Sequence, residues 1–527
     1  MADSVESIQT VAADRVGWAA PVVVAVAASL LVLFATSRYG PGITPDSVQY
    51  LSAAQSFQAG DGLTGIDGTR VAWWAPGYPV LLSATSSLFD LSVVEASRFL
   101  NAVAILVSTL LAWHLLSALF PAPTALLVLI VYALGSCQLV VTTKMLTEPA
   151  FAVLINLLVG VLGRGDRWRS LLLAAVIGAA CFLMRYAGAA IVAAAALYVI
   201  LSDSSRRTGL WKAVVLSVVA AVPGILWMLR NLRVSGTLTG VRSNPESLDA
   251  VASTFVAGMS ELFVLPGLPS VLSLVTGSAV VLLIGWSILH VYLTAVRGGG
   301  LKTPAPRMGV VELSAIVVAV YLAFLVFTSF TGLSSPINAR LLHPVLLPTL
   351  IVIGAAATLG SGALQRALRP VLVALVVVTV GGGTLYAVMR HDLGGGGLNT
   401  EAWRNSATVL KLRDVPDISP FWSNKPEAIR FFRGVQSFSL VEDDLEEESA
   451  GVVVVWFADY GRNADAYRQW AARRFAWLLP TLVSAQRPVD AAVDCNAVRR
   501  DLSIERGVVV AAMGDGCIFA VGATDGE

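Results

Sequence analysis

The sequence predicts a polytopic α-helical membrane protein with about eleven transmembrane helices, a long first extracytoplasmic loop and a small C-terminal α/β domain. Of its 527 residues, 56% are hydrophobic and only 13% are charged, whereas about a quarter of the residues of soluble proteins are charged. The mean hydropathy is +0.74. Apolar stretches of about 20 residues, long enough to cross a bilayer, recur between residues 18 and 389.

The apolar stretches place the transmembrane helices in order along the chain. The two stretches that flank Arg185 are short, and one long bent helix is the alternative to a pair. The expected spans are 18–37, 99–119, 122–142, 148–163, 171–184, 187–201, 213–229, 271–296, 313–330, 341–359 and 370–389.

The basic residues orient these helices. Loops 164–169, 206–212, 297–307 and 366–369 are rich in Arg and Lys, and such loops face the cytoplasm. We therefore expect a multi-pass protein of the cell membrane (the inner or plasma membrane). Its N-terminus is expected to be cytoplasmic, with the first loop and the C-terminal part on the outer side. The first stretch lacks a basic segment followed by a cleavage site, so we interpret it as a retained helix.

The first outer loop, 38–97, carries Asp46 just after the first span. A carboxylate held at the membrane surface is suited to act as a general base. A structural alternative is that Asp46 caps the helix predicted after Pro45, since Asp at a helix start accepts backbone N–H bonds.

Several charged residues are expected at the same outer level of the bundle. Glu148 begins a predicted span, and helix-start complementarity would also explain it. Charges gathered at one depth suggest a shared cavity, although snorkelling explains any single arginine. A ring of cations facing a carboxylate suits a phosphate-linked lipid substrate. The candidate binding residues are Lys144, Glu148, Arg185, Arg230, Arg340 and His343.

The apolar spans end near residue 390, and the sequence after it is typical of a small α/β domain. We divide it into a transmembrane part, 1–390, and an extracytoplasmic α/β part, 391–527. Gly394 to Gly397 is interpreted as a flexible joint, and acidic runs at 442–444 and 446–448 as a solvated surface. We expect strands at 452–456, 507–513 and 517–521 and a helix at 465–478.

Two of the four cysteines, Cys495 and Cys517, lie in this C-terminal part. A disulfide is chemically allowed on the outer side of the membrane, but spacing alone does not establish it. Cys137 and Cys181 lie in predicted spans and are expected to be inert.

The sequence lacks the motifs of several other functional classes. The net charge is +1 without a basic run, so no nucleic-acid partner is indicated. P-loop, dinucleotide, zinc-protease and serine-hydrolase motifs do not occur in the sequence. A divalent metal is not excluded, but no ligand cluster supports one. The two halves of the membrane part do not resemble each other, which counts against a transporter built from repeats.

The order of motifs resembles that of the GT-C glycosyltransferases that use polyprenyl-phosphate sugars. The resemblance is strongest to the family 39 group, which contains protein O-mannosyltransferases and lipid A aminoarabinose transferases. Together the motifs cover most of the chain in order. They are Pro45-Asp46-Ser47-Val48-Gln49-Tyr50, Trp74-Ala75-Pro76-Gly77-Tyr78-Pro79, Leu146-Thr147-Glu148-Pro149, Met184-Arg185-Tyr186, Trp227-Met228-Leu229-Arg230-Asn231, Arg340-Leu341-Leu342-His343-Pro344 and Trp422-Ser423-Asn424-Lys425-Pro426.

The resemblance implies a GT-C-like catalytic domain with Asp46 at the catalytic centre, Arg340 on the donor phosphate, and Tyr50 as a further candidate contact. It implies inverting transfer of a hexose or pentose from a polyprenyl-phosphate donor to an envelope glycan, lipid or protein at the outer face. Family members often have two adjacent acidic residues in the first loop, whereas Ser47 follows Asp46 here. That difference weakens a two-carboxylate or metal-assisted mechanism. Asp61 and Asp67 are alternative second carboxylates.

Two other classes of function stay open. A lipid or solute transporter or flippase would also have many spans and outer arginines, but it would need charges near the bilayer midplane, where the sequence has few. A non-catalytic assembly factor would use the C-terminal part to bind a partner and would not need Asp46.

Overall fold

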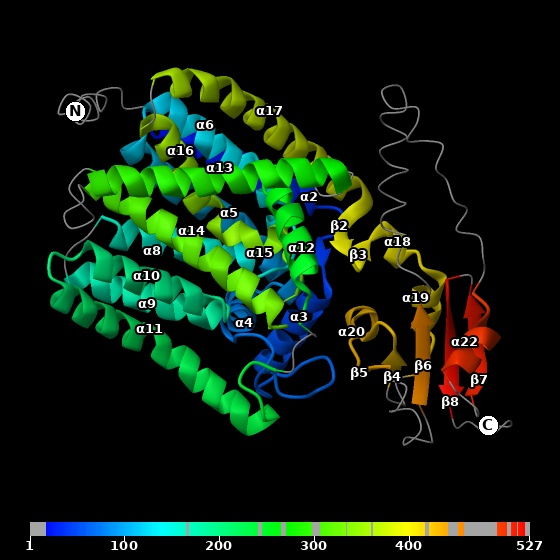
Figure 1. Cartoon of the computed structure of the whole chain (residues 1–527). Helices are drawn as coiled ribbons and strands as arrows, with labels where there is room; N and C mark the ends of the chain where they lie inside the picture. The colour runs from blue at the N-terminus through cyan, green and yellow to red at the C-terminus, as the bar shows by residue number, and fades with distance from the viewer. Residues whose placement is uncertain are drawn as a thin grey trace, which may run out of the picture. The chain divides into compact units, whose positions relative to one another are not determined.

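The computed structural model describes residues 17–164, 168–240, 245–264, 270–297, 306–333, 335–359, 362–416, 421–440, 452–457, 493–502, 507–513 and 515–521. They form two compact units (Figure 1). The first unit contains the residues up to Leu33, Ala72–Tyr78 and Phe99–Ala387. The second unit contains Phe34–Val71, Pro79–Arg98 and the residues from Val388 onward.

The first unit is a bundle of apolar helices. Seven helices of the described residues are long and apolar enough to cross a membrane: Val93–Leu119, Ala122–Thr142, Arg206–Ser235, Ser270–Leu293, Met308–Phe330, Ala339–Thr358 and Val373–Leu393. Shorter apolar helices are Ala19–Ala35, Glu148–Leu162, Trp168–Met184 and Gly188–Ser202. Every predicted span overlaps one of these segments, so the chain is a multi-pass membrane protein; the number eleven stays a prediction.

The bounds of the helices are as follows. Those mainly in the first unit are α2 (Ala19–Ala35), α5 (Val93–Leu119), α6 (Ala122–Leu134), α7 (Ser136–Thr142), α8 (Glu148–Leu162), α9 (Trp168–Met184), α10 (Gly188–Ser202), α11 (Arg206–Ser235), α12 (Leu248–Glu261), α13 (Ser270–Arg297), α14 (Pro306–Phe330), α15 (Ala339–Leu342), α16 (Leu346–Leu359) and α17 (Gly362–Leu393). A 3₁₀ turn, His343–Val345, joins α15 to α16.

Helices α9 and α10 are separate and pack side by side with α11 (Figure 1), so the alternative of one bent helix around Arg185 is wrong. Small residues allow the close approach. A Cβ at Gly188 would lie 2.3 Å from the carbonyl carbon of Cys181, and one at Gly224 would lie 2.4 Å from the ring of Phe182. The turn between α9 and α10 therefore presents Arg185 at the end of the helix pair.

The second unit contains helices and two small sheets. Its helices are α3 (Pro45–Gln58), most of α4 (Gly77–Phe89), α18 (Glu401–Arg404), α19 (Ala407–Leu412), α20 (Pro426–Arg433) and α22 (Cys495–Asp501). Its strands are β1 (Pro41–Ile43), β2 (Gly394–Gly397), β3 (Asn399–Thr400), β4 (Phe421–Ser423), β5 (Ser437–Ser439), β6 (Val452–Phe457), β7 (Gly507–Met513) and β8 (Gly516–Val521).

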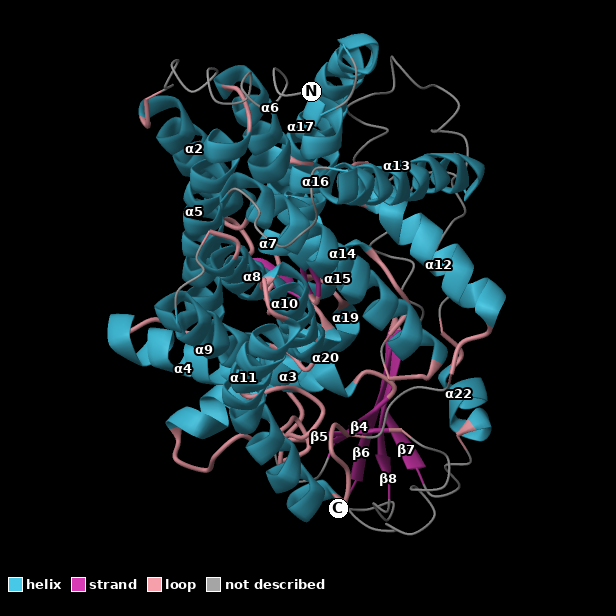
Figure 2. Ribbon diagram, turned by 60° about the vertical axis from the view of Figure 1, so that its left-hand side comes forward, coloured by secondary structure: helices cyan, strands magenta, loops and turns pink. Residues whose placement is uncertain are grey.

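The larger sheet has the order β5-β4-β6-β8-β7 (Figure 2). Strand β4 is parallel to β5 and β6, whereas β8 is antiparallel to its neighbours β6 and β7. Strands β6, β7 and β8 lie where the sequence predicted them. Cys495 of α22 and Cys517 of β8 form a disulfide with their Cα atoms 5.7 Å apart. The predicted helix 465–478 and both acidic runs lie outside the described residues, and the division at residue 390 stays a prediction.

The interpretation of Gly394–Gly397 as a flexible joint is wrong. This segment is strand β2, which pairs in parallel with β1 and antiparallel with β3. Glycine is required because the backbones approach closely: a Cβ at Gly397 would lie 1.8 Å from the Ile43 carbonyl oxygen. Gly394, Gly396 and Gly397 also have positive φ angles, which glycine adopts without steric cost.

Candidate functional site

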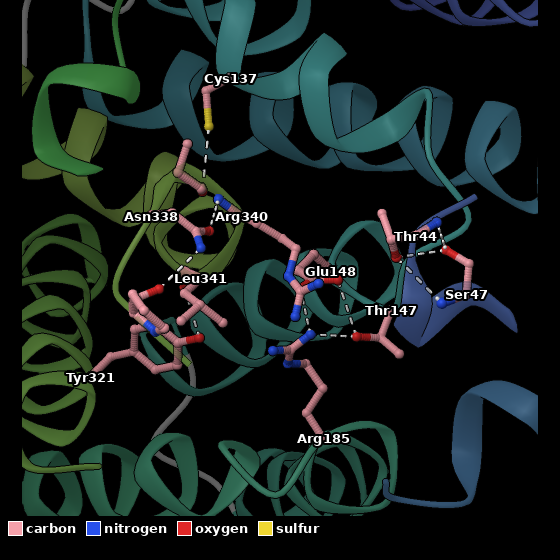
Figure 3. A network of polar contacts seen from close by, with 12 residues as sticks. Thr44, Ser47, Cys137, Thr147, Glu148, Arg185, Tyr321, Asn338, Arg340 and Leu341 are labelled. Atoms are coloured by element: carbon pink, nitrogen blue, oxygen red, sulfur yellow. Dashed lines mark hydrogen bonds and ion pairs between the residues drawn. The ribbon is translucent and has the colours of Figure 1, made fainter. Parts of the chain in front are cut away.

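A buried carboxylate forms the centre of the candidate site in the first unit. Glu148 is the first residue of α8, and its side chain is 1% exposed. Its Oε1 lies 2.6 Å from an Nη of Arg185 and 3.0 Å from Nε of Arg340. Figure 3 shows the two guanidinium groups converging on Glu148, one from the turn between α9 and α10 and the other from α15. The sequence placed these three residues at one level of the bundle, and the two ion pairs bring them into contact.

Neighbouring polar groups hold both arginines in place. The Thr147 hydroxyl accepts a hydrogen bond from Arg185 (Figure 3). Asn338 caps α15, since its Oδ1 accepts the backbone N–H of Arg340 at 3.0 Å. The Tyr321 hydroxyl donates to the Leu341 carbonyl at 3.0 Å. These contacts fix the position of Arg340 at the start of its helix, and neither Thr147 nor Asn338 was singled out from the sequence.

The cluster of Glu148, Arg185 and Arg340 carries two positive charges and one negative charge. Glu148 is enclosed, whereas the side chains of Arg185 and Arg340 are 15% and 26% exposed. Burying a charge without a partner is costly, so each guanidinium stabilises the carboxylate. These three residues together carry a net charge of +1, and planar guanidinium forks match phosphate oxygens in geometry.

His343 and Lys144 are placed differently from this cluster. His343 is 1% exposed, and its Nε2 lies 2.7 Å from Oε1 of the buried Gln138, a position that favours a structural role. Lys144 acts electrostatically on Glu261 at the end of α12: burial raises the pKa of Glu261, and the Lys144 charge opposes that rise. Glu261 also accepts the backbone N–H of Ala339 at 3.3 Å. No sequence motif pointed to Glu261.

Arg230 belongs to a second network in the first unit. Its guanidinium lies 4.5 Å from the centre of the Trp227 ring and donates to Asn231 Oδ1 at 3.1 Å. Asn231 in turn donates to the Tyr186 hydroxyl at 2.9 Å, and Tyr186 donates to the Ala72 carbonyl at 2.7 Å. The network thus joins the motif at the end of α11 to the neighbours of Arg185 and to the segment just before Trp74.

Asp46 and Tyr50 lie on α3 in the second unit. Thr44, not Asp46, is the N-cap: its hydroxyl accepts the Ser47 N–H at 3.3 Å, and Ser47 accepts the Thr44 N–H at 2.9 Å (Figure 3). The interpretation of Asp46 as the cap is therefore wrong, and Asp46 is an acidic residue of the first turn, partly exposed. Tyr50 is 4% exposed, which favours a packing role.

The described carboxylates of the first loop are not grouped into a metal site. Within the part of the chain that the structure describes, no three His, Cys, Asp or Glu side chains are grouped as metal ligands. Asp61 and Asp67 follow Asp46 in the loop, and Asp67 caps a local turn by accepting the Thr69 N–H at 3.0 Å.

Known proteins share this architecture. Residues 74–227 match the family model described as dolichyl-phosphate-mannose-protein mannosyltransferase. The structure of ArnT from Cupriavidus metallidurans bound to undecaprenyl phosphate is similar with a TM-score of 0.57 and 14% identity, over 95% of this chain and 97% of that one. The fold is that of the GT-C glycosyltransferases. No curated protein matches the chain by sequence.

Other GT-C structures are similar over smaller shares of their own length. The archaeal oligosaccharyltransferase AglB from Archaeoglobus fulgidus, solved with an inhibitory peptide and a dolichol-phosphate, has a TM-score of 0.52 and 11% identity, over 85% of this chain and 71% of that one. The arabinofuranosyltransferase AftD from Mycobacteria has a TM-score of 0.50 and 15% identity, over 97% of this chain and 40% of that one. The segment matched by the family model contains Glu148 and Arg185, whereas Asp46 and Arg340 lie outside it.

Proposed function

We propose that the chain is an inverting glycosyltransferase that moves one sugar from a polyprenyl-phosphate donor to an acceptor hydroxyl or amine of the cell envelope. The observation that carries the proposal is the pair of guanidiniums, Arg185 and Arg340, held on one buried carboxylate, Glu148. The GT-C fold supports it, since ArnT has been solved with undecaprenyl phosphate and AglB with a dolichol-phosphate. The sugar moved in this proposal is a hexose or a pentose.

The arginine cluster would bind the donor phosphate. Glu148 orients both guanidiniums, and the net charge of the three residues is opposite in sign to that of a phosphodiester. Arg340 is the principal contact in the proposal, because its side chain is the more exposed of the two. As the donor bond breaks, a second negative charge develops on the leaving phosphate, and fixed cationic donors stabilise that charge.

Asp46 would act as the general base. It takes the proton from the acceptor hydroxyl while the acceptor oxygen bonds to the anomeric carbon, and the bond between that carbon and the phosphate oxygen breaks. The products are the glycosylated acceptor and polyprenyl phosphate. One displacement inverts the anomeric carbon and needs one base, which is consistent with a lone Asp46 at the first turn of α3.

The remaining candidates have weaker support. Lys144 and Arg230 stay secondary phosphate candidates because each retains a positive charge, although Arg230 is stacked on Trp227. His343 and Tyr50 are assigned to packing because both are buried.

The proposed orientation puts the N-terminus in the cytoplasm and the tail after Glu527 outside the cell membrane. It rests on the basic loops of the sequence. Reporter fusions test it: alkaline phosphatase fused after Glu527 should be active, and green fluorescent protein at the same place should be dark. The reverse pattern would contradict the proposed side of the reaction.

Donor binding is the direct test of the proposed phosphate site. We expect purified full-length protein in detergent to bind undecaprenyl phosphate, and Arg340→Lys to weaken binding by about tenfold, because lysine loses one charge-assisted hydrogen bond. The matched control is Arg233→Lys, since Arg233 is an exposed arginine near the end of α11. Equal affinity of the wild-type and Arg340→Lys proteins would place the phosphate site elsewhere.

A further inference from the structure

The second unit contains a pocket of about 310 Å³, near the lower end of the usual range of ligand sites, about 300–1,000 Å³. It lies between the last turns of α3, the loop that follows α3, and the segment around α20 and β5. Polar side chains dominate its lining, which includes Gln55, Ser56, Asp61, Thr64, Arg430 and Gln436.

The walls of this pocket are held by hydrogen bonds on both sides. The Ser56 hydroxyl donates to the Gly62 carbonyl at 2.8 Å and accepts the Thr64 N–H at 3.0 Å. The Ser52 hydroxyl donates to the Gly65 carbonyl at 2.9 Å. On the other side, the Ser437 N–H donates to the Ile66 carbonyl at 3.2 Å. The loop is therefore fixed to both α3 and β5, and the pocket is preformed.

The pocket floor depends on glycine. Gly68 has a φ angle of +78°, and a Cβ there would lie 2.5 Å from Nε2 of Gln436. The absence of a side chain lets the Gln436 amide lie directly over the loop backbone. Gln436 is exposed, and among the described residues no hydrogen bond engages its amide or that of Gln55. Both amides are thus available to a ligand.

The charge balance of the lining identifies the ligand chemistry. Asp61 and Arg430 contribute one charge of each sign, so the lining has no net charge to attract a phosphate or a cation. Primary amides and hydroxyls both donate and accept hydrogen bonds, as the hydroxyl groups of a sugar do. Among the described residues that line the pocket there is no aromatic ring, so these residues offer polar contacts rather than stacking.

We propose that this pocket binds a neutral sugar residue of the acceptor through its hydroxyl groups, with the Gln55 and Gln436 amides as the main contacts. The inference rests on the proposed glycosyltransferase function, because it takes the acceptor to be a glycan. Asp46 and Gln55 lie on the same helix, nine residues apart, which corresponds to about 14 Å along the axis. The pocket would therefore hold a sugar residue of the acceptor that is distant from the reacting hydroxyl. In this way it would select acceptors by the glycan chain that they carry.

Glycan binding tests the proposal. Full-length protein in detergent is labelled and applied to an array of neutral oligosaccharides of glucose, galactose, mannose and arabinose, with sulfated and sialylated counterparts. We expect retention on neutral glycans, and a loss of about tenfold or more in the double variant Gln55→Ala, Gln436→Ala, since each amide supplies hydrogen bonds to the sugar. Gln55→Trp, which fills the pocket from an exposed position, should give the same loss.

The matched control is Asn405→Ala, which removes an exposed amide of the same unit outside the pocket, and it should bind as the wild type does. No retention of the wild type on neutral glycans, retention only on charged glycans, or equal retention of the double variant would each overturn the proposal. Undecaprenyl phosphate binding is measured on the same samples. If the wild type does not bind undecaprenyl phosphate, the proposed donor site is wrong. The array result alone decides whether the pocket binds a sugar.

Discussion

The two units hold their candidate functional side chains by different means. In the first unit, Arg185 and Arg340 are held by side chains, through ion pairs to the buried Glu148. In the second unit, Asp46 is held by the backbone: the Thr44–Ser47 capping box starts α3, and β2 pairs with β1 just before it. Side-chain contacts position the two guanidiniums, whereas a backbone anchor positions the helix that carries Asp46. Substitutions should therefore affect the two regions differently.

The largest effect is expected at Asp46. Asp46→Asn should lower transfer activity by about 10²- to 10⁴-fold, because the amide is no base, while thermal unfolding stays nearly unchanged, because Thr44 and Ser47 supply the cap. The measurement is sugar transfer by full-length protein in detergent, beside an unfolding curve.

Asp90→Asn is the control for that variant. Asp90 is an exposed carboxylate of the same unit with a φ angle of 51°, which asparagine tolerates. It should retain full activity. If the Asp46→Asn variant has wild-type activity, Asp46 is not the general base, and its charge only complements the dipole at the start of α3.

In the first unit the expected loss is of stability. Glu148→Gln leaves two neighbouring guanidiniums without their carboxylate, and breaking a buried ion pair costs about 3–5 kcal/mol. The free energy of unfolding, followed by tryptophan fluorescence in denaturant, should fall accordingly. Asp414→Asn is the matched control, since Asp414 pairs with Lys411 at 3.3 Å on the surface, where a pair contributes about 1 kcal/mol or less. Equal changes in both variants would mean that the cluster is no more stabilising than a surface pair.

A smaller loss is expected from the backbone anchor. Gly397→Ala places a methyl group against the Ile43 carbonyl and forces alanine into a positive φ angle of 60°, which should lower the free energy of unfolding by about 1–3 kcal/mol. Because Ile43 precedes α3, activity should fall as well. Gly381→Ala is the control: Gly381 lies within α17 with open space around it, so alanine should be neutral or stabilising. Unchanged activity and stability in Gly397→Ala would mean that β2 does not position α3.

The difference between side-chain and backbone positioning explains which features could be predicted from the sequence. Hydrophobic stretches located the helices. Charges at predicted span ends placed Glu148, Arg185 and Arg340 at one level of the bundle, but the ion pairs among them are seen only in the folded chain. Gly394–Gly397 was misread because glycine strands lack side-chain alternation, and their pairing depends on backbone approach that only the folded chain shows. The roles of Glu261 and Asn338 also escaped, since each contacts the segment at Ala339 and Arg340 from a site with no motif of its own. The assignment of Asp46 as the base stays a prediction.

The smallest effect concerns Glu261, which supports the backbone before Arg340. Burial raises its pKa above the usual value of 4.5, so the folded protein holds this proton at pH values where the unfolded chain has lost it. The contribution to stability is therefore full below about pH 4 and declines as pH rises through the folded pKa. Glu261→Gln keeps an acceptor for the Ala339 N–H and cannot ionise, so its unfolding free energy should decline less than that of the wild type between pH 4 and pH 7. Glu401→Gln, at an exposed position on α18, serves as the control. A wild type and a Glu261→Gln variant with the same pH dependence would show that the Ala339 hydrogen bond and the Lys144 charge together offset the burial of Glu261.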